Sequence, residues 1–204
     1  ACYNGSSEMV TQFSNAVITF LFNIILMRLA GPNGVAAITI LLYGQFLFQA
    51  FYLGFSIGIS PVIGFQYGAE NRKELKNIYH ISFRFTAIVS VFMTAAAIFL
   101  STGIVTIFTD DPKTHALAVT GFGIFAYNFL FSGFNIASSG FFTALSDGKS
   151  SAIISFCRTL LFTVVSLLVL PRFFGVNGAW LAIPVAELVT LLLSIWMHRK
   201  YLYR

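Results

Sequence analysis

Charged side chains are scarce in this sequence. Asp, Glu, Lys and Arg make up 9% of the 204 residues, whereas hydrophobic residues make up 57%. A soluble domain has about 25% charged residues, so this chain lacks the side chains that would cover a surface facing water. The composition indicates an integral membrane protein. Its net charge of +5 then bears on loop topology, and we expect no nucleic-acid partner.

Cysteine is nearly absent as well. Cys2 and Cys157 lie far apart in or beside apolar segments, where thiols behave as small hydrophobic side chains, so no disulfide framework is indicated. The three histidines have no Cys or acid at metal-ligand spacing. No catalytic triad or glycine-rich phosphate loop is recognisable, so we expect no catalytic residues, metal or cofactor. The chain starts without Met or a basic leader, which suggests a piece of a longer protein.

Long apolar segments dominate what is present. A hydrocarbon core of about 30 Å takes roughly 20 residues of helix. The sequence therefore predicts an all-α polytopic membrane protein with six transmembrane helices, which span about residues 2–29, 34–68, 81–108, 113–145, 150–170 and 178–197. Turn residues separate them at 30–33, at 109–112, where a capping side chain precedes a proline, and at Pro171-Arg172.

The second segment contains Pro61, which removes an N–H group and predicts a kink. Glycines with the spacing that allows close helix packing in lipid occur at Gly54, Gly58, Gly64 and Gly68. They are either a contact face or a chance pattern.

The basic residues are distributed unevenly between the two sides. With six spans, nine of the twelve lie on the side of the chain ends and three on the other side. The positive-inside rule therefore places both ends in the cytoplasm, in a cell membrane. The two turns before the second and sixth segments, residues 31–36 and 175–180, also resemble each other. Because Asn-Gly is common in turns, that match is weak support for an internal repeat.

Polar residues recur with the spacing 0, 4, 7, 11, 15 in three segments, which puts each set on one helix face. The first set is Glu8, Gln12, Asn15, Thr19 and Asn23; the second is Gln45, Gln49, Tyr52, Ser56 and Ser60; the third is Asn128, Ser132, Asn135, Ser139 and Thr143. Amides facing lipid lack partners, so we expect all three faces to point into the bundle. They either bond helix to helix or line a hydrated substrate cavity.

Two carboxylates lie inside apolar segments. Glu187 is near the middle of the sixth, three residues after Pro184, and Glu8 is near the start of the first. Ionisable groups in the membrane are costly, which makes both candidates for binding a proton or a coupling cation. Alternatively, Glu187 is a structural partner of a nearby hydroxyl or basic group, and Glu8 lies at the membrane edge. Arg158, in the fifth segment, is expected to extend toward the cytoplasm.

Several short motifs resemble one known family. Gly58-Ile59-Ser60-Pro61 and Tyr67-Gly68-Ala69, followed by a basic loop, resemble the second helix of a lobe in the multidrug and toxic compound extrusion (MATE) transporters. Residues 142–149 and 177–182 look like that family's fourth-to-fifth and fifth-to-sixth connections. The similarity extends over essentially all 204 residues and aligns with the C-terminal half of a twelve-helix protein.

The resemblance implies an exporter that alternates access and couples efflux of drugs or metabolites to inward H⁺ or Na⁺. It also implies a partner lobe of six helices, N-terminal in the same polypeptide and absent from this chain. The acid on the family's first helix corresponds to Glu8. Many members carry another acid on the fourth helix, where this chain has Asn128, Ser132 and Asn135 instead. Both H⁺ and Na⁺ therefore stay open as coupling ion.

The sequence thus favours one lobe of a cation-coupled antiporter for organic cations. In that reading Gln12, Asn15, Gln45, Gln49, Tyr52, Asn128, Ser132 and Asn135 form the substrate cavity, and Glu8 and Glu187 bind the coupling ion or proton. A lipid-linked saccharide flippase of the same superfamily is the alternative, but it favours a cavity rich in Arg and Lys. A scaffold subunit would tolerate Leu in the polar faces. An intramembrane enzyme would need two converging groups, such as Glu8 and Glu187.

Overall fold

The chain is helical throughout the part that the structure describes. A computed structural model describes the backbone of residues 2–202 and the side chains of Met9 and of residues 12–200. Its elements are α1 (Cys2–Gly68), α2 (Arg72–Phe108), α3 (Pro112–Phe125), the 3₁₀ turn η1 (Ala126–Asn128), α4 (Phe129–Ala144), α5 (Gly148–Phe156), the π-helical turn η2 (Cys157–Leu161) and α6 (Phe162–Leu202). Four stretches are long and apolar enough to cross a membrane: Gln12–Gly68, Arg72–Phe108, Pro112–Ala144 and Gly148–Lys200. The protein is an all-α, multi-pass membrane protein in contact with lipid.

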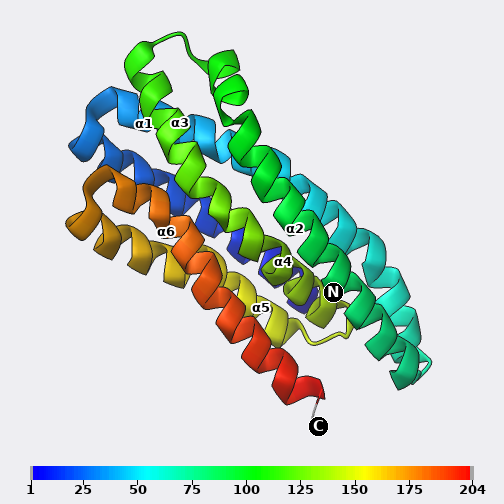
Figure 1. Cartoon of the computed structure of the whole chain (residues 1–204). Coiled ribbons are helices and arrows are strands. Elements are labelled where there is room, and N and C mark those ends of the chain that lie inside the picture. The colour runs from blue at the N-terminus through cyan, green and yellow to red at the C-terminus, as the bar shows by residue number, and fades with distance from the viewer. Residues whose placement is uncertain (1, 203–204) are drawn as a thin grey trace.

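Two of these long helices turn back on themselves. α1 is interrupted at Gly31 (φ 65°, ψ −156°) and α6 at Gly175 (φ 55°, ψ −132°). In Figure 1 each helix reverses direction at the end of the bundle, so it consists of two antiparallel arms. Positive φ with strongly negative ψ is accessible essentially to glycine alone, which explains why the turns lie at these residues.

The two turns are built alike. Each has the sequence Gly-x-Asn-Gly, and the second glycine is packed closely in both. A Cβ on Gly34 would lie 2.7 Å from the Cβ of Ala30, and one on Gly178 would lie 2.7 Å from the backbone N of Pro171. The similarity between residues 31–36 and 175–180 therefore extends to backbone conformation and to the close return of the second arm.

The prolines do not end the helices. We expected the fifth segment to stop at Pro171-Arg172, but the helix continues to Gly175. Likewise, α1 runs through Pro61 to Gly68. A proline removes one backbone hydrogen bond but keeps a helical φ, whereas reversal of the chain needs the positive φ of glycine. The N-caps follow the sequence signals: Asp111 accepts from Thr114 N at 2.8 Å in α3, and Asp147 accepts from Ser150 N at 3.2 Å in α5.

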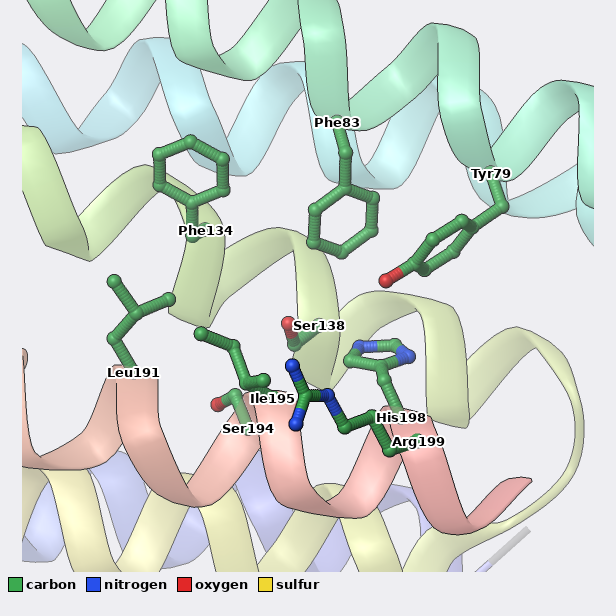
Figure 2. A pocket seen from close by; sticks show the side chains of 9 residues that line it. All are labelled: Tyr79, Phe83, Phe134, Ser138, Leu191, Ser194, Ile195, His198 and Arg199. Atoms are coloured by element: carbon green, nitrogen blue, oxygen red, sulfur yellow. The ribbon is translucent and has the colours of Figure 1, made fainter. Parts of the chain in front are cut away.

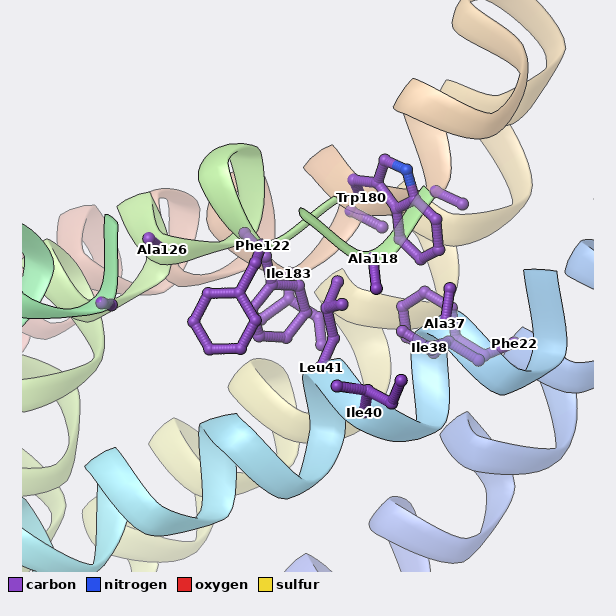
Figure 3. Packing of buried hydrophobic residues seen from close by; sticks show 14 of the residues in the cluster. Phe22, Ala37, Ile38, Ile40, Leu41, Ala118, Phe122, Ala126, Trp180 and Ile183 are labelled. Atoms are coloured by element: carbon purple, nitrogen blue, oxygen red, sulfur yellow. The ribbon is translucent and has the colours of Figure 1, made fainter. Parts of the chain in front are cut away.

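The apolar core lies where α1, α3 and α6 meet. Figure 3 shows Phe22, Leu41, Phe122 and Trp180 from these three helices packed together, and all four side chains are fully buried. This core holds the returning arms of α1 and α6 against the middle of the bundle.

Close backbone approach uses other glycines than those expected. Within the described structure, added Cβ atoms on Gly54, Gly58 and Gly68 would meet nothing within 4 Å. The contact-face reading of that pattern is therefore wrong for these three positions inside the bundle. One tight contact is on α4, where a Cβ on Gly133 would lie 2.7 Å from Tyr52 Cε1 and 2.8 Å from Ser90 Oγ. Gly133 thus lets α1, α2 and α4 meet at one level.

Candidate functional site

Glu187 is a buried acid in the second arm of α6. Its side chain is 5% exposed, although it lies in a helix that is apolar on most faces. Asn135 of α4 donates from Nδ2 to Glu187 Oε2 at 2.7 Å and to the Glu187 carbonyl at 2.9 Å. The Asn135 Oδ1 atom accepts a hydrogen bond from Ser194 Oγ at 3.1 Å. One amide thus connects α4 to two successive parts of α6.

Arg158 faces the same carboxylate, which corrects our expectation that it extends toward the cytoplasm. Its Nη1 atom lies 3.8 Å from Glu187 Oε1, and its side chain is 13% exposed. Arg158 belongs to the π-helical turn η2, and its carbonyl accepts a hydrogen bond from Thr163 Oγ1 at 2.8 Å. Such turns shift the helix face by one residue and are frequent at functional sites. We call Glu187, Asn135, Arg158 and Ser194 the polar centre.

Hydroxyl groups on α2 lie toward the interior and were missed by the sequence analysis. Ser82, Thr86, Ser90 and Thr94 are buried at intervals of four residues. This regular spacing was readable in the sequence, but residues 82–94 carry no amide or acid that would have drawn attention to it. Across from them, the buried Tyr52 hydroxyl of α1 donates to the Phe129 carbonyl at 3.1 Å. Tyr52 and Ser90 meet at Gly133, next to Ser132 in sequence.

The third predicted polar set, on η1 and α4, serves mainly to connect helices. Ser139 lies 2.9 Å from Ser151 and 3.0 Å from Ser155, measured between hydroxyl oxygens. Thr143 Oγ1 donates to Ser151 Oγ at 2.8 Å. These hydroxyls join α4 to α5. Asn128 is fully buried and donates to the Phe125 carbonyl at 2.6 Å, and Ser132 is fully buried as well.

The first polar set does not face into the bundle, which corrects the expectation that all three do. Gln12, Asn15 and Thr19 are exposed and Asn23 is half-buried. The buried face of this arm carries Ser14, Ile18, Phe22 and Leu26 instead. The larger apolar side chains at four-residue spacing decide which face packs, and the amides are turned to the outside of this lobe.

The second polar set, on the returning arm of α1, is more buried than the first and less buried than the third. Gln45 and Gln49 are half-buried, whereas Tyr52 and Ser56 are buried. Because the arms of α1 run antiparallel from Gly31, Gln12 and Gln49 lie about equally far from the turn. The Glu8 side chain lies outside the described residues. Among the residues that are described, no group of three or more His, Cys, Asp or Glu side chains could hold a metal ion.

A cavity of about 410 Å³ lies between α2, α4 and α6, and Figure 2 shows its lining. None of the eight residues predicted for the substrate cavity belongs to that lining. Ser194 does, so the cavity reaches the polar centre. His198 also lines it and is 4% exposed. The sequence analysis considered the histidines only as metal ligands and did not recognise that aromatic rings of α2 and α4 would bury His198.

Solved structures share this fold. An outward-facing and an inward-facing structure of a multidrug resistance MATE family transporter of the MOP superfamily each match with a TM-score of 0.89 at 20% identity. A MOP superfamily transporter from Pyrococcus furiosus matches with a TM-score of 0.89 at 19% identity. Each match covers 97% of this chain, and 45%, 46% and 45% of the respective solved chains. This chain therefore spans less than half the length of those proteins.

A comparison with curated proteins finds no match. The family model described as MatE matches residues 9–168. That match covers most of the chain, and the fold agrees with solved members, so this protein belongs to the MatE family of membrane transporters, which are not enzymes.

Proposed function

We propose that this chain is one lobe of a secondary active efflux transporter, a proton-coupled antiporter of organic cations. In this proposal the lobe has six transmembrane helices. The first two are the two arms of α1, and the third is α2. The fourth is α3 together with α4, the fifth is α5 together with the first arm of α6, and the sixth is the second arm of α6. Nine of the twelve basic residues then lie on the side of the chain ends, so both ends are cytoplasmic in a cell membrane. A second six-helix lobe, N-terminal to this one, completes the transporter.

The observation that carries the proposal is the buried Glu187 beside Arg158. Coupling requires a group inside the membrane that can change its charge, and acids in spanning helices are the usual candidates. Protonation of Glu187 would leave the guanidinium 3.8 Å away without a counter-charge, which is unfavourable in an apolar interior. We expect Arg158 to respond by moving, and its place in the π-helical turn supports such a shift.

The position of Arg158 also favours H⁺ over Na⁺ at this site. A sodium ion bound to Glu187 would lie close to the guanidinium and be repelled by it, whereas a proton on the carboxylate adds no separate cation. Glu8, which corresponds to the family's acid on the first helix, stays a second candidate for the proton or ion and for the counter-charge to the substrate.

The outward-facing amides of α1 support a substrate path at the surface between the two lobes. Gln12 and Asn15 are exposed on this lobe, and amides are poorly accommodated in lipid. A face that meets water and the other lobe accommodates an exposed amide such as that of Asn15 better than lipid does. Gln45 and Gln49, half-buried on the returning arm, extend the same surface inward. We assign amphipathic organic cations to this surface because amide oxygens and aromatic rings bind such groups.

Alternating access is supported by the comparisons, since outward-facing and inward-facing structures match this lobe equally well, each with a TM-score of 0.89. A lobe that keeps its internal fold can move as one body against its partner. A flippase would favour a cavity rich in Arg and Lys, and Arg158 is the one cation that the sequence offers for it. Because Arg158 is instead paired with Glu187, we favour antiport.

The test is transport by the full-length protein in vesicles. A fluorescent organic cation is loaded, and pH and Na⁺ gradients are imposed separately. We expect the pH gradient to drive efflux and Glu187→Gln to lower that efflux at least about tenfold, while the exposed control Glu70→Gln leaves it unchanged. Efflux that responds to neither gradient would contradict antiport. Full pH-driven efflux by Glu187→Gln would remove Glu187 from coupling.

A further inference from the structure

The cavity between α2, α4 and α6 contains buried polar groups that have no hydrogen-bond partner in the part of the chain that the structure describes. His198 is 4% exposed, and neither ring nitrogen has a hydrogen-bond partner among the described residues. Ser138 is 1% exposed, and its hydroxyl likewise has no partner in the described structure. Buried polar atoms are almost always hydrogen-bonded in native proteins. Two such groups lining one cavity indicate a ligand that supplies their partners.

The polar groups lie toward one end of the cavity. In Figure 2, Ser138, His198 and the Arg199 guanidinium lie near one another, whereas Phe134 and Leu191 lie at the other end. Arg199 is exposed and makes no ion pair with any described residue. Hydroxyl, imidazole and guanidinium groups can all donate hydrogen bonds to one anion, and the guanidinium supplies the positive charge.

Apart from Ser194 and the Tyr79 hydroxyl, the rest of the lining is apolar. Phe83 and Phe134 stand on one side, and Leu191 and Ile195 of α6 on the other. The helices that frame the cavity also carry exposed apolar side chains, such as Phe85 and Ile88 on α2 and Leu192 on α6. In a membrane-spanning helix such faces contact acyl chains. A ligand can therefore enter from the bilayer without crossing water.

The surrounding charge fits an anionic headgroup. α6 ends here with Arg199 and Lys200, and α2 begins at this end with Arg72 and Lys73. The Lys200 ammonium lies 5.4 Å from the centre of the Trp196 ring, and tryptophan and basic residues are typical of the membrane–water interface. The cavity thus extends from the level expected for headgroups to the level of acyl chains.

We propose that this cavity binds one anionic phospholipid of the bilayer. Its phosphate accepts hydrogen bonds from the Ser138 hydroxyl and the His198 ring and pairs with Arg199. Part of one acyl chain packs between Phe83, Phe134 and Leu191. A volume of about 410 Å³ falls in the range of roughly 300–1,000 Å³ that small-molecule sites have. This site is separate from the proposed substrate surface, and the inference does not depend on antiport.

The test measures lipid retention by the full-length protein. Native mass spectrometry compares phosphatidylglycerol and phosphatidylcholine with identical acyl chains, added to delipidated protein. We expect one phosphatidylglycerol to bind about tenfold more tightly than phosphatidylcholine. Arg199→Gln, which changes an exposed residue and leaves the helix intact, lowers that preference about tenfold. The matched control Arg172→Gln, exposed at the opposite end of the bundle, keeps it.

A second measurement locates the lipid. Phosphatidylglycerol with a photoreactive group on one acyl chain should crosslink to peptides that contain residues 79–83, 134–138 or 191–199, and His198→Gln should reduce this labelling. Inorganic phosphate should not compete, because it lacks the acyl chain. Equal binding of the two lipids would overturn the proposal. The proposal would also be overturned if Arg199→Gln and Arg172→Gln lowered the preference for phosphatidylglycerol equally. Crosslinks to other peptides, or displacement of the lipid by inorganic phosphate, would overturn it as well.

Discussion

The side-chain amide of Asn135 donates both of its N–H groups to Glu187, to Oε2 at 2.7 Å and to the backbone carbonyl at 2.9 Å. Its oxygen accepts from Ser194 at 3.1 Å, so this fully buried amide has no N–H group left for a substrate. We therefore expect Asn135 to position the acid rather than to bind a substrate. In this one contact, a member of the third polar set bonds two helices together and holds the candidate coupling acid.

Arg158 and Glu187 should show a strong energetic coupling. Removal of either charge leaves the other buried and unpaired, which typically destabilises by about 3–5 kcal/mol. We expect Arg158→Gln and Glu187→Gln each to lower the thermal stability of the detergent-solubilised protein. The double variant should regain about 2 kcal/mol relative to the sum of the single changes, within the range usual for contacting residues. Additive losses would show that the 3.8 Å contact contributes no coupling.

Gly133 should not tolerate alanine. The added methyl group would lie 2.7 Å from Tyr52 Cε1 and 2.8 Å from Ser90 Oγ, and the tyrosine ring is fixed by its hydrogen bond to Phe129. Overpacking of this kind costs about 1–3 kcal/mol. The matched control is Gly103→Ala in α2, where an added Cβ meets nothing within 4 Å. That change should be neutral or stabilise by about 0.5–1 kcal/mol. Equal melting temperatures for the two variants would contradict the close packing of α1, α2 and α4.

Gly175 should be equally intolerant, but for a backbone reason. Its φ of 55° and ψ of −132° cost a residue with a Cβ about 1–3 kcal/mol, although an added Cβ would meet no neighbour within 4 Å. Gly175→Ala should therefore destabilise while Gly103→Ala does not, as measured by thermal unfolding. Since Gly31 has the same conformation, Gly31→Ala should give a loss of similar size. A harmless Gly175→Ala would mean that the turn reaches an ordinary conformation at little cost.

The parts of this fold that depend on local chemistry were predictable. Asp111 before a proline signals a helix start, and Gly31 beside Pro32 signals a break, because capping and backbone preference act over a few residues. The direction in which the first polar set points was not predictable, since it depends on the packing of Phe22 and Leu26 against other helices. The contact between Arg158 and Glu187 was missed for a related reason. It depends on a π-helical turn that changes the direction of Arg158 and on α6 returning past it.

The Asp111 cap predicts a pH dependence outside the membrane. The Thr114 backbone N–H, which donates to this carboxylate at 2.8 Å, lowers its pKa from the usual 3.8. A lowered pKa in the folded state gives a stabilisation that is complete above the pKa of the unfolded chain and lost as pH falls through the folded value. The difference in melting temperature between the protein and Asp111→Ala should therefore be constant at neutral pH and shrink below about pH 4. A difference that grows on acidification would contradict the sign of this shift.

Asn15 offers the cleanest test of the proposed substrate surface. Asn135→Leu would break the contacts to Glu187 and Ser194, so a loss of transport there could reflect misfolding. Asn15 is exposed on the lobe, and leucine is a good helix former. Asn15→Leu should therefore change the free energy of unfolding by no more than about 0.5 kcal/mol. If the outward face of α1 binds the cation, this variant should raise the apparent KM for efflux about tenfold. The control Thr39→Val, also exposed on α1, removes a polar group near the turn and should leave KM unchanged. Unaltered KM in Asn15→Leu, at full expression and stability, would favour a face that only contacts the other lobe, as a scaffold would.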